Sequence, residues 1–331
     1  MATRRGMLGA AASLALPGPA ALAQSGPGSP RRIGVLMSNA EADPVSAPRL
    51  AAFRQALQEL GWREGENLRI ELRWGEGRQA LIRRQAAEMV AFGPEAILAN
   101  GTPVVAAVQP LTRSIPVVAA LMNDPVGLGF VESLARPGAN ITGFTFINPG
   151  LIAKWVSLLH EVAPRLRRAA LLYSPRLNPW YPAFLAEIAR GPAPLPLEIV
   201  PFHVEAGDDL RRHLAEAARQ PDTGLVAGPD SFVLGRFGEL AGLALAHRLP
   251  GISVYRQFAV EGGLMSYGPD VPDIFRRAAG YVDRILRGAS PAALPVQEPV
   301  TFEFALNQRA ALALGLSPSA TLLAAADTVI D

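Results

Sequence analysis

The sequence contains no cysteine among its 331 residues. This absence excludes disulfide bonds, thiolate metal sites and a cysteine nucleophile, and it also excludes a lipid anchor on an N-terminal cysteine. Histidine is scarce as well, and the four copies are scattered along the chain: His160, His203, His213 and His247. We therefore expect no metal site and no catalytic centre built on histidine.

Signatures of common enzyme classes are also missing. The phosphate-binding pattern G-x-x-x-x-G-K-[ST], the zinc pattern H-E-x-x-H and the nucleophile elbow G-x-S-x-G do not occur. Gly127-Leu128-Gly129 lacks the third glycine of a dinucleotide fingerprint, so we expect no cofactor there. No segment after the N-terminus is long and apolar enough to span a membrane, and no basic run suggests nucleic acid.

The N-terminus carries the pattern of an export signal. Two arginines precede the apolar stretch 7–16, and a small-x-small site ends at Ala23, as in secretory signal peptides. Residues 3–8 also resemble the twin-arginine motif, with a disordered basic N-terminus as the alternative. We expect residues 1–23 to be a signal cleaved near Ala23, residues 24–30 to be a leader, and the product to be periplasmic. Cleavage brings the formal net charge from +2 to zero.

From residue 31 onward, short apolar runs alternate with amphipathic helical stretches. This alternation predicts parallel sheets covered by helices on both faces. Because about 308 residues exceed one typical core, we expect two lobes. Strands are expected at 33–37, 68–74, 96–99, 115–121, 141–144, 169–173, 197–202, 224–227, 252–255, 263–267 and 301–306. Helices are expected at 47–60, 81–92, 103 onward, 127–135, 151–162, 181–190, 208–219, 232–248 and 271–286, with two short ones after Asn307 and Ser317.

The fold class expected from this order is α/β, with two doubly wound parallel-sheet lobes joined by a hinge of several crossings. The C-terminal segment is too short for a third core, so it must return to the first two. Lobe 1 is expected to comprise 31–143 plus 262–295, and lobe 2 to comprise 144–261 plus 296–331. Crossings near 143–150, 261–263 and 296–301 would restrict the lobes to hinge closure around a ligand.

Polar residues follow many of the expected strands, where open α/β sheets bind their ligands. The candidate ligand-binding residues are Ser38, Asn39, Asn100, Gly101, Thr102, Asp124, Ser174, Asn178, Asp230, Tyr255 and Tyr267. Each has a structural alternative: Thr102 and Asp124 could simply cap helices, and both tyrosines could belong to the core.

A series of short motifs resembles one known family over nearly the whole chain. The motifs are Phe53-Arg54-Gln55-Ala56-Leu57, Glu59-Leu60-Gly61-Trp62, Gly101-Thr102-Pro103, Asp124-Pro125-Val126-Gly127-Leu128-Gly129, Asn140-Ile141-Thr142-Gly143 and Gly262-Gly263-Leu264-Met265-Ser266-Tyr267-Gly268. This chain is similar in these positions to the ABC-transporter substrate-binding family that includes tryptophan- and tyrosine-uptake binding proteins. The resemblance implies a type I periplasmic-binding fold and delivery of an amino acid or similar carboxylate to a permease and its ATPase. It departs from the family pattern at 174–181, where Arg176 and Trp180 could alter the pocket.

The function expected from residues and resemblance together is capture of a small ligand by a monomeric, non-catalytic, soluble protein. Two alternatives remain open. One is a ligand-sensing protein for a membrane signalling partner, and the other is a periplasmic isomerase-type enzyme with Asp124 and Asp230 as its acid and base.

Overall fold

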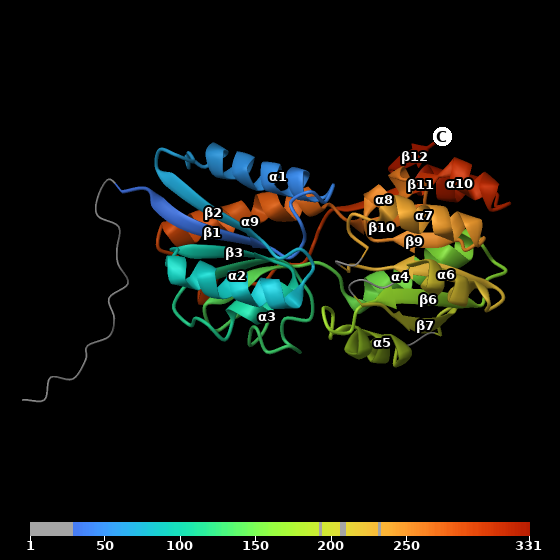
Figure 1. Cartoon of the computed structure of the whole chain (residues 1–331), viewed down its shortest axis with the longest axis horizontal. Coiled ribbons are helices and arrows are strands. Elements are labelled where there is room, and N and C mark those ends of the chain that lie inside the picture. Colours follow the sequence, from blue (N-terminus) through green and yellow to red (C-terminus); the bar gives the residue numbers. More distant parts are fainter. Residues whose placement is uncertain (1–28, 192–193, 206–209, 231–232) are drawn as a thin grey trace, which may run out of the picture.

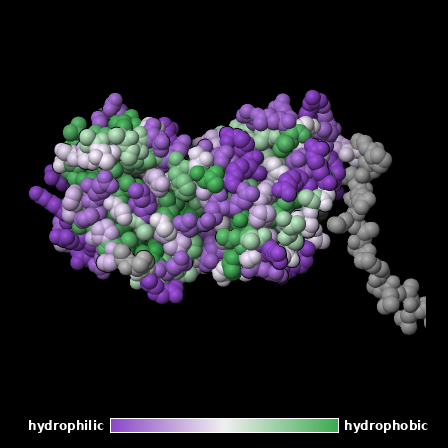
Figure 2. All heavy atoms as spheres, turned by 180° about the vertical axis from the view of Figure 1, so that it is seen from behind, coloured by the Kyte–Doolittle hydropathy of each residue, from purple (hydrophilic) through white to green (hydrophobic). Residues whose placement is uncertain are grey.

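The computed structural model of the chain describes residues 29–191, 194–205, 210–230 and 233–331 (Figure 1). The expected signal at 1–23 and the expected helix cap Asp208 lie outside the described residues. The described chain forms two α/β lobes that lie side by side along the long axis of the molecule (Figure 1). Seen from behind, hydrophilic and hydrophobic side chains are intermixed over both lobes, and a waist separates them (Figure 2).

Lobe 1 is built on a parallel five-stranded sheet of order β2-β1-β3-β4-β5. Helices α1 and α9 cover one face and pack against each other, while α2 and α3 cover the other face (Figure 1). The inner strands are continuous apolar runs because both of their faces are covered. The elements are β1 (Arg31–Met37), α1 (Ser46–Glu59), β2 (Leu68–Trp74), α2 (Gln79–Phe92), β3 (Ala96–Asn100), α3 (Thr102–Val108), β4 (Val117–Met122), β5 (Ile141–Thr145) and α9 (Val271–Leu286).

Lobe 2 is built on a seven-stranded sheet of order β12-β11-β10-β9-β8-β6-β7. All its pairs are parallel except β10 with β11. The elements are α4 (Pro149–Val162), β6 (Arg168–Tyr173), α5 (Tyr181–Ala189), β7 (Glu198–His203), α6 (Leu210–Ala218), β8 (Thr223–Ala227), α7 (Phe237–Ala246), β9 (Gly251–Ser253), α8 (Arg256–Val260), β10 (Met265–Pro269), β11 (Phe302–Asn307), α10 (Gln308–Ala313), α11 (Ala320–Ala325) and β12 (Thr328–Ile330). The 3-10 helix η1 (Pro291–Ala293), which follows α9, contacts β5 of lobe 1.

The predicted fold class is confirmed, and two local predictions are wrong. Residues 127–135 form turns instead of a helix, because the backbone N–H groups of Leu128 and Phe130 close tight turns onto Asp124 and Pro125. Residues 265–269 belong to lobe 2, although 262–295 was expected in lobe 1, because β10 pairs with β9 and β11. From that expected segment, α9 does pack on lobe 1.

The chain passes between the lobes three times in the described structure: from β5 to α4, from β10 to α9, and from η1 to β11. The second passage therefore lies at residues 269–271 and not at the predicted 261–263. Two of these passages run directly into a capped helix. Asn148 Oδ1 accepts a hydrogen bond from Leu151 N, and Asp270 Oδ1 accepts one from Asp273 N, each at 3.0 Å.

Gly143 allows the last strand of lobe 1 to approach its neighbour closely. Its φ is 136°, and a Cβ at this position would lie only 2.0 Å from the carbonyl oxygen of Ala119 in β4. No side chain fits there, so glycine is required for the pairing of β4 with β5.

Candidate functional site

Each sheet has one point where the strand order reverses direction. In lobe 1 it lies between β1 and β3, and in lobe 2 between β6 and β8. Loops that leave neighbouring strands at such a point diverge to opposite faces of the sheet and open a crevice between them. Residues from both switch points line one cavity between the lobes, so the fold itself brings the two loop pairs together.

This interlobe cavity has a volume of about 40 Å³. It contains seven of the eleven residues predicted from the sequence: Ser38, Asn100, Gly101, Thr102, Asn178, Asp230 and Tyr255. Its other lining residues are Arg49, Pro103, Leu121, Asn123, Phe146, Pro229 and Leu234. Both lobes therefore contribute polar side chains to one small cavity.

The wall from lobe 1 is a network of amides and hydroxyls. Asn100 Oδ1 accepts a hydrogen bond from Ser38 Oγ at 3.0 Å, and Thr102 Oγ1 accepts one from Asn123 N at 2.9 Å. Asn100 Nδ2 is buried and has no partner among the described residues. Gly101 adopts a φ of 85°, which lets the backbone turn sharply into α3 beside Ser38. This wall thus presents an unsatisfied amide donor.

The wall from lobe 2 centres on the carboxylate of Asp230. Asp230 is 2% exposed, and its Oδ2 accepts hydrogen bonds from Ser174 N at 2.6 Å and Asn178 Nδ2 at 2.7 Å. Two N–H donors thus hold one oxygen of this buried carboxylate in a fixed position. Lobe 2 therefore offers the cavity a fixed acceptor.

Tyr255 closes the cavity with an aromatic ring that contacts both lobes. Its ring centroid lies 5.7 Å from Phe146, on the first passage between lobes, and 5.7 Å from Phe237 in α7. Burial raises the pKa of the Tyr255 phenol, so it stays neutral near neutral pH.

Four predicted site residues lie outside the cavity lining. Asn39 donates to Ser46 Oγ, and Ser174 reaches the site only through its backbone N–H to Asp230. Asp124 Oδ1 accepts a hydrogen bond from Gly127 N within a turn, so Asp124 does not cap a helix there as the structural alternative supposed. Tyr267 is half-buried and stacks on the exposed ring of Phe302 in the sheet of lobe 2, so it lies neither in the interlobe cavity nor fully in the core.

Arg49 is the most informative residue that sequence reasoning missed. A signal for it exists in the helical spacing, because Arg49 lies four residues before Phe53 and therefore on the buried face of α1. A charge at such a position is unusual, since buried arginines need partners. Asn123 was passed over in favour of its neighbour Asp124.

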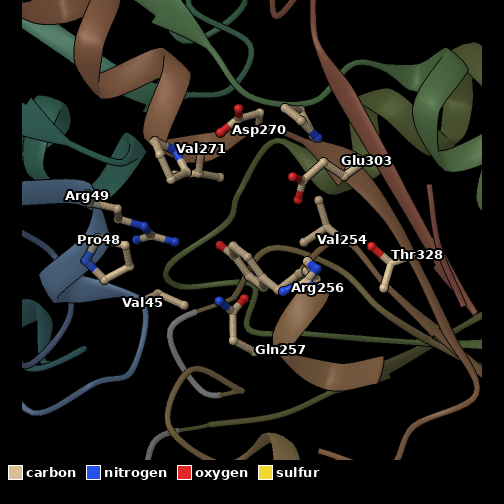
Figure 3. Close-up of a pocket in the computed structure, with 14 residues that line it drawn as sticks. Val45, Pro48, Arg49, Val254, Arg256, Gln257, Asp270, Val271, Glu303 and Thr328 are labelled. Atoms are coloured by element: carbon tan, nitrogen blue, oxygen red, sulfur yellow. The ribbon is translucent and has the colours of Figure 1, made fainter. Parts of the chain in front are cut away.

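A second cavity of about 310 Å³ lies beside the passages between lobes (Figure 3). We call it the hinge cavity. Its charged lining residues are Arg49 from α1, Arg256 from α8, Asp270 before α9 and Glu303 in β11. Arg49 and Tyr255 line both cavities, so this pair separates one from the other.

Within the described ranges, no three histidine or acidic side chains gather closely enough to hold a metal ion. Nor does any helix in that part of the chain have the length and apolar character needed to cross a bilayer.

Comparisons with known proteins agree with this geometry. Residues 41–330 match the sequence profile of the family described as ABC transporter substrate binding protein. The chain is 22% identical over 267 residues to a tyrosine-binding protein of Clostridioides difficile, covering 80% of this chain and 75% of that protein.

Solved structures give the same result for the fold. A conserved domain protein of Vibrio cholerae superimposes with a TM-score of 0.83 at 24% identity, over 90% of this chain and 99% of that one. An ABC domain of Streptococcus pneumoniae in complex with L-Trp gives 0.82 at 23% identity, over 91% and 100%. At these identities the likeness shows a shared two-lobed fold.

Proposed function

The chain belongs to the family of ABC transporter substrate-binding proteins, and from that premise we propose that its ligand is an amino acid or a similar small carboxylate. The solute-binding role for an ABC importer follows from the family, and we assign the ligand to the interlobe cavity. One observation carries this assignment: polar groups from the switch points of both sheets converge on that single cavity.

The two walls of the cavity suit the two ends of an α-amino acid. The Asn100 amide of lobe 1 is a donor for a carboxylate, while the Asp230 carboxylate of lobe 2 is an acceptor for an ammonium group. The relatives named above support the class, since one is called tyrosine-binding and another was solved with L-Trp.

Capture requires the lobes to separate and close again. Small-molecule pockets typically measure about 300–1,000 Å³, whereas the interlobe cavity measures about 40 Å³. A ligand therefore enters an open form, and its contacts with both walls stabilise the closed form. The three passages between lobes confine this movement to a hinge.

We further propose that the protein acts as a monomer, without catalysis, and passes its ligand to a membrane permease driven by a cytoplasmic ATPase. The Asp124 carboxylate that the isomerase alternative needs accepts a hydrogen bond from Gly127 N and does not line the interlobe cavity, which supports binding without catalysis. A sensing role would predict a receptor gene beside this one instead of permease and ATPase genes.

The proposed location is the periplasm, after cleavage near Ala23. The signal pattern in residues 1–23 and the absence of cysteine support a free exported protein. N-terminal sequencing of the secreted form tests the cleavage site, and replacement of the two arginines in residues 3–8 by lysine tests the twin-arginine route.

Calorimetric titration with the L-amino acids and small carboxylates tests the function. We expect one class to bind and to be recovered unchanged. Asp230→Asn should weaken an ammonium-bearing ligand by about tenfold or more. Arg176→Gln is the matched control, because Arg176 lies at the surface beside Glu205 and outside the interlobe cavity, contrary to the expectation that it alters the pocket. Binding to no small solute, or turnover of the bound one, contradicts the proposal.

A further inference from the structure

Arg49 is a buried charge whose donors the described residues satisfy only in part. It lies in the first turn of α1 and is 2% exposed. Its Nε and Nη2 atoms are buried and have no hydrogen-bond partner among the described residues. A guanidinium remains charged in proteins and presents its N–H groups as a rigid fork, which matches a carboxylate in two-point contact.

The environment of Arg49 comes mainly from the opposite lobe. Its guanidinium carbon lies 5.6 Å from the centre of the Tyr255 ring. Burial lowers the pKa of Arg49, and a side-chain hydrogen bond with Tyr255 and the carboxylate charge of Asp43 oppose that effect. Asp43 Oδ2 already accepts a hydrogen bond from Ala40 N, at 2.8 Å. Tyr255 thus satisfies part of the guanidinium, while Nε and Nη2 remain without a partner among the described residues.

The carboxylates of the hinge cavity do not pair with the Arg49 guanidinium either. Figure 3 shows Glu303 and Asp270 across the cavity from Arg49. Asp270 Oδ1 caps α9, and Glu303 is exposed to solvent. Neither accepts a hydrogen bond from Arg49 Nε or Nη2.

The burial of Arg49 depends on contact between the lobes. Arg49 belongs to lobe 1 and Tyr255 to lobe 2, and a nearby loop contact joins them as well, because a Cβ at Gly235 would lie 2.7 Å from Asp43 Oδ1. Separation of the lobes would return the guanidinium to water. Closure without an anion then buries an uncompensated cation, which is strongly unfavourable, whereas closure around an anion pairs it.

We infer that Arg49 binds the carboxylate of the ligand and thereby makes lobe closure conditional on an anionic group. This inference rests on the proposed function and adds a selection rule to it. Arg49 reaches the interlobe cavity beside Asn100, so the two together form the carboxylate end of the site. Solutes that lack a carboxylate fail to close the lobes even when their remaining groups fit.

Closure can be followed directly because the chain has no native cysteine to compete with a label. Ala87→Cys on α2 and Ala186→Cys on α5 lie at exposed positions, one in each lobe. A fluorescent pair on these two cysteines reports the distance between lobes. The variants are Arg49→Gln, which removes the charge, and Arg49→Lys, which keeps the charge but loses the fork.

The control is Arg54→Gln in the same helix, since Arg54 is exposed and pairs with Glu64 away from both cavities. In buffer alone we expect Arg49→Gln to shift toward the short distance, while Arg49→Lys and Arg54→Gln match the parent. An Arg49→Gln distribution identical to that of Arg54→Gln overturns the inference, and this arm requires no ligand.

The second arm uses L-tyrosine and L-tryptophan with their amides, in which the carboxylate is replaced by a neutral group. For whichever acid closes the parent protein, we expect its amide to fail and Arg49→Gln to bind the acid about 30-fold or more weakly. Equal closure by acid and amide overturns the inference but leaves solute capture intact. If neither acid binds the parent, the first arm still decides the role of Arg49, and the broader titration decides the proposed function.

Discussion

The ring of Tyr181 stabilises the folded protein, whereas its buried hydroxyl destabilises it. The ring stacks on Trp180 at a centroid distance of 3.9 Å, but the buried hydroxyl has no partner among the described residues. An unsatisfied buried hydroxyl is unfavourable by about 1–3 kcal/mol. Tyr181→Phe should therefore leave the free energy of unfolding unchanged or raise it by about 1 kcal/mol at pH 7, as measured by urea denaturation.

Tyr173→Phe is the matched control for this substitution. The Tyr173 hydroxyl hydrogen-bonds to His203 Nε2 at 3.1 Å, so its removal should lower the free energy of unfolding by about 0.5–1.5 kcal/mol. Equal losses in the two variants would show that Tyr181 has a partner after all.

The buried tyrosines also make stability depend on alkaline pH. Burial raises the pKa of Tyr173, Tyr181, Tyr255 and Tyr281 in the folded protein. When a phenol has a higher pKa in the folded protein than in the unfolded chain, the free energy of unfolding is constant at pH values below the unfolded pKa of about 10. It decreases as the pH rises above that value. We expect unfolding free energies to be flat from pH 8 to 9 and to fall above about pH 10, less steeply in Tyr181→Phe. A decline that is already complete below pH 9 would contradict this assignment.

At the scale of elements, the caps at two lobe passages stabilise helices that begin where the chain bends. Asn148→Ala and Asp270→Ala each remove one cap and should lower the free energy of unfolding by about 1 kcal/mol. Ser319→Ala, which uncaps α11 far from the passages, should lose a similar amount. Only the first two variants should also change the distance between lobes reported by the fluorescent pair, and a change in Ser319→Ala would argue against a hinge role.

The pairing of β4 with β5 predicts a more severe outcome at Gly143. An added methyl group would overlap the carbonyl oxygen of Ala119, and φ of 136° is unfavourable for any L side chain. Gly143→Ala should destabilise the protein by about 3 kcal/mol or more, measured by urea denaturation. Gly242→Ala is the control, because a Cβ there meets no neighbour within 4 Å.

Periodicity predicted most elements because most are short apolar runs or amphipathic helices with clear end signals. It failed at 127–135, where an apolar spacing suited a helix but Asp124 and Pro125 hold the backbone in turns. It could not assign β10 to a lobe, since a strand's partners are set by long-range pairing. In the site, strand-end loops were predictable from topology, while Arg49 required knowledge of what faces α1 from the other lobe.

At the scale of the whole molecule, lobe 1 is incomplete without a helix from far along the chain. Helix α9 packs against α1 and against strands β3, β4 and β5. A fragment of residues 29–148 should therefore unfold without cooperativity in urea, as followed by circular dichroism. Joining residues 271–286 to its end through a flexible Gly/Ser linker should restore a cooperative transition. A cooperative transition in the fragment alone would show that α9 is dispensable.

Because α9 follows the strands of lobe 1 by more than 120 residues in the sequence, lobe 1 cannot be completed until late in translation. Synthesis proceeds at about 5–20 residues per second, so on the order of 10 s separates the emergence of β5 from that of α9. During that interval the nascent first sheet has one apolar face without its final cover. We therefore expect the growing chain to associate with a holding chaperone and to complete lobe 1 only after lobe 2 has largely been synthesised.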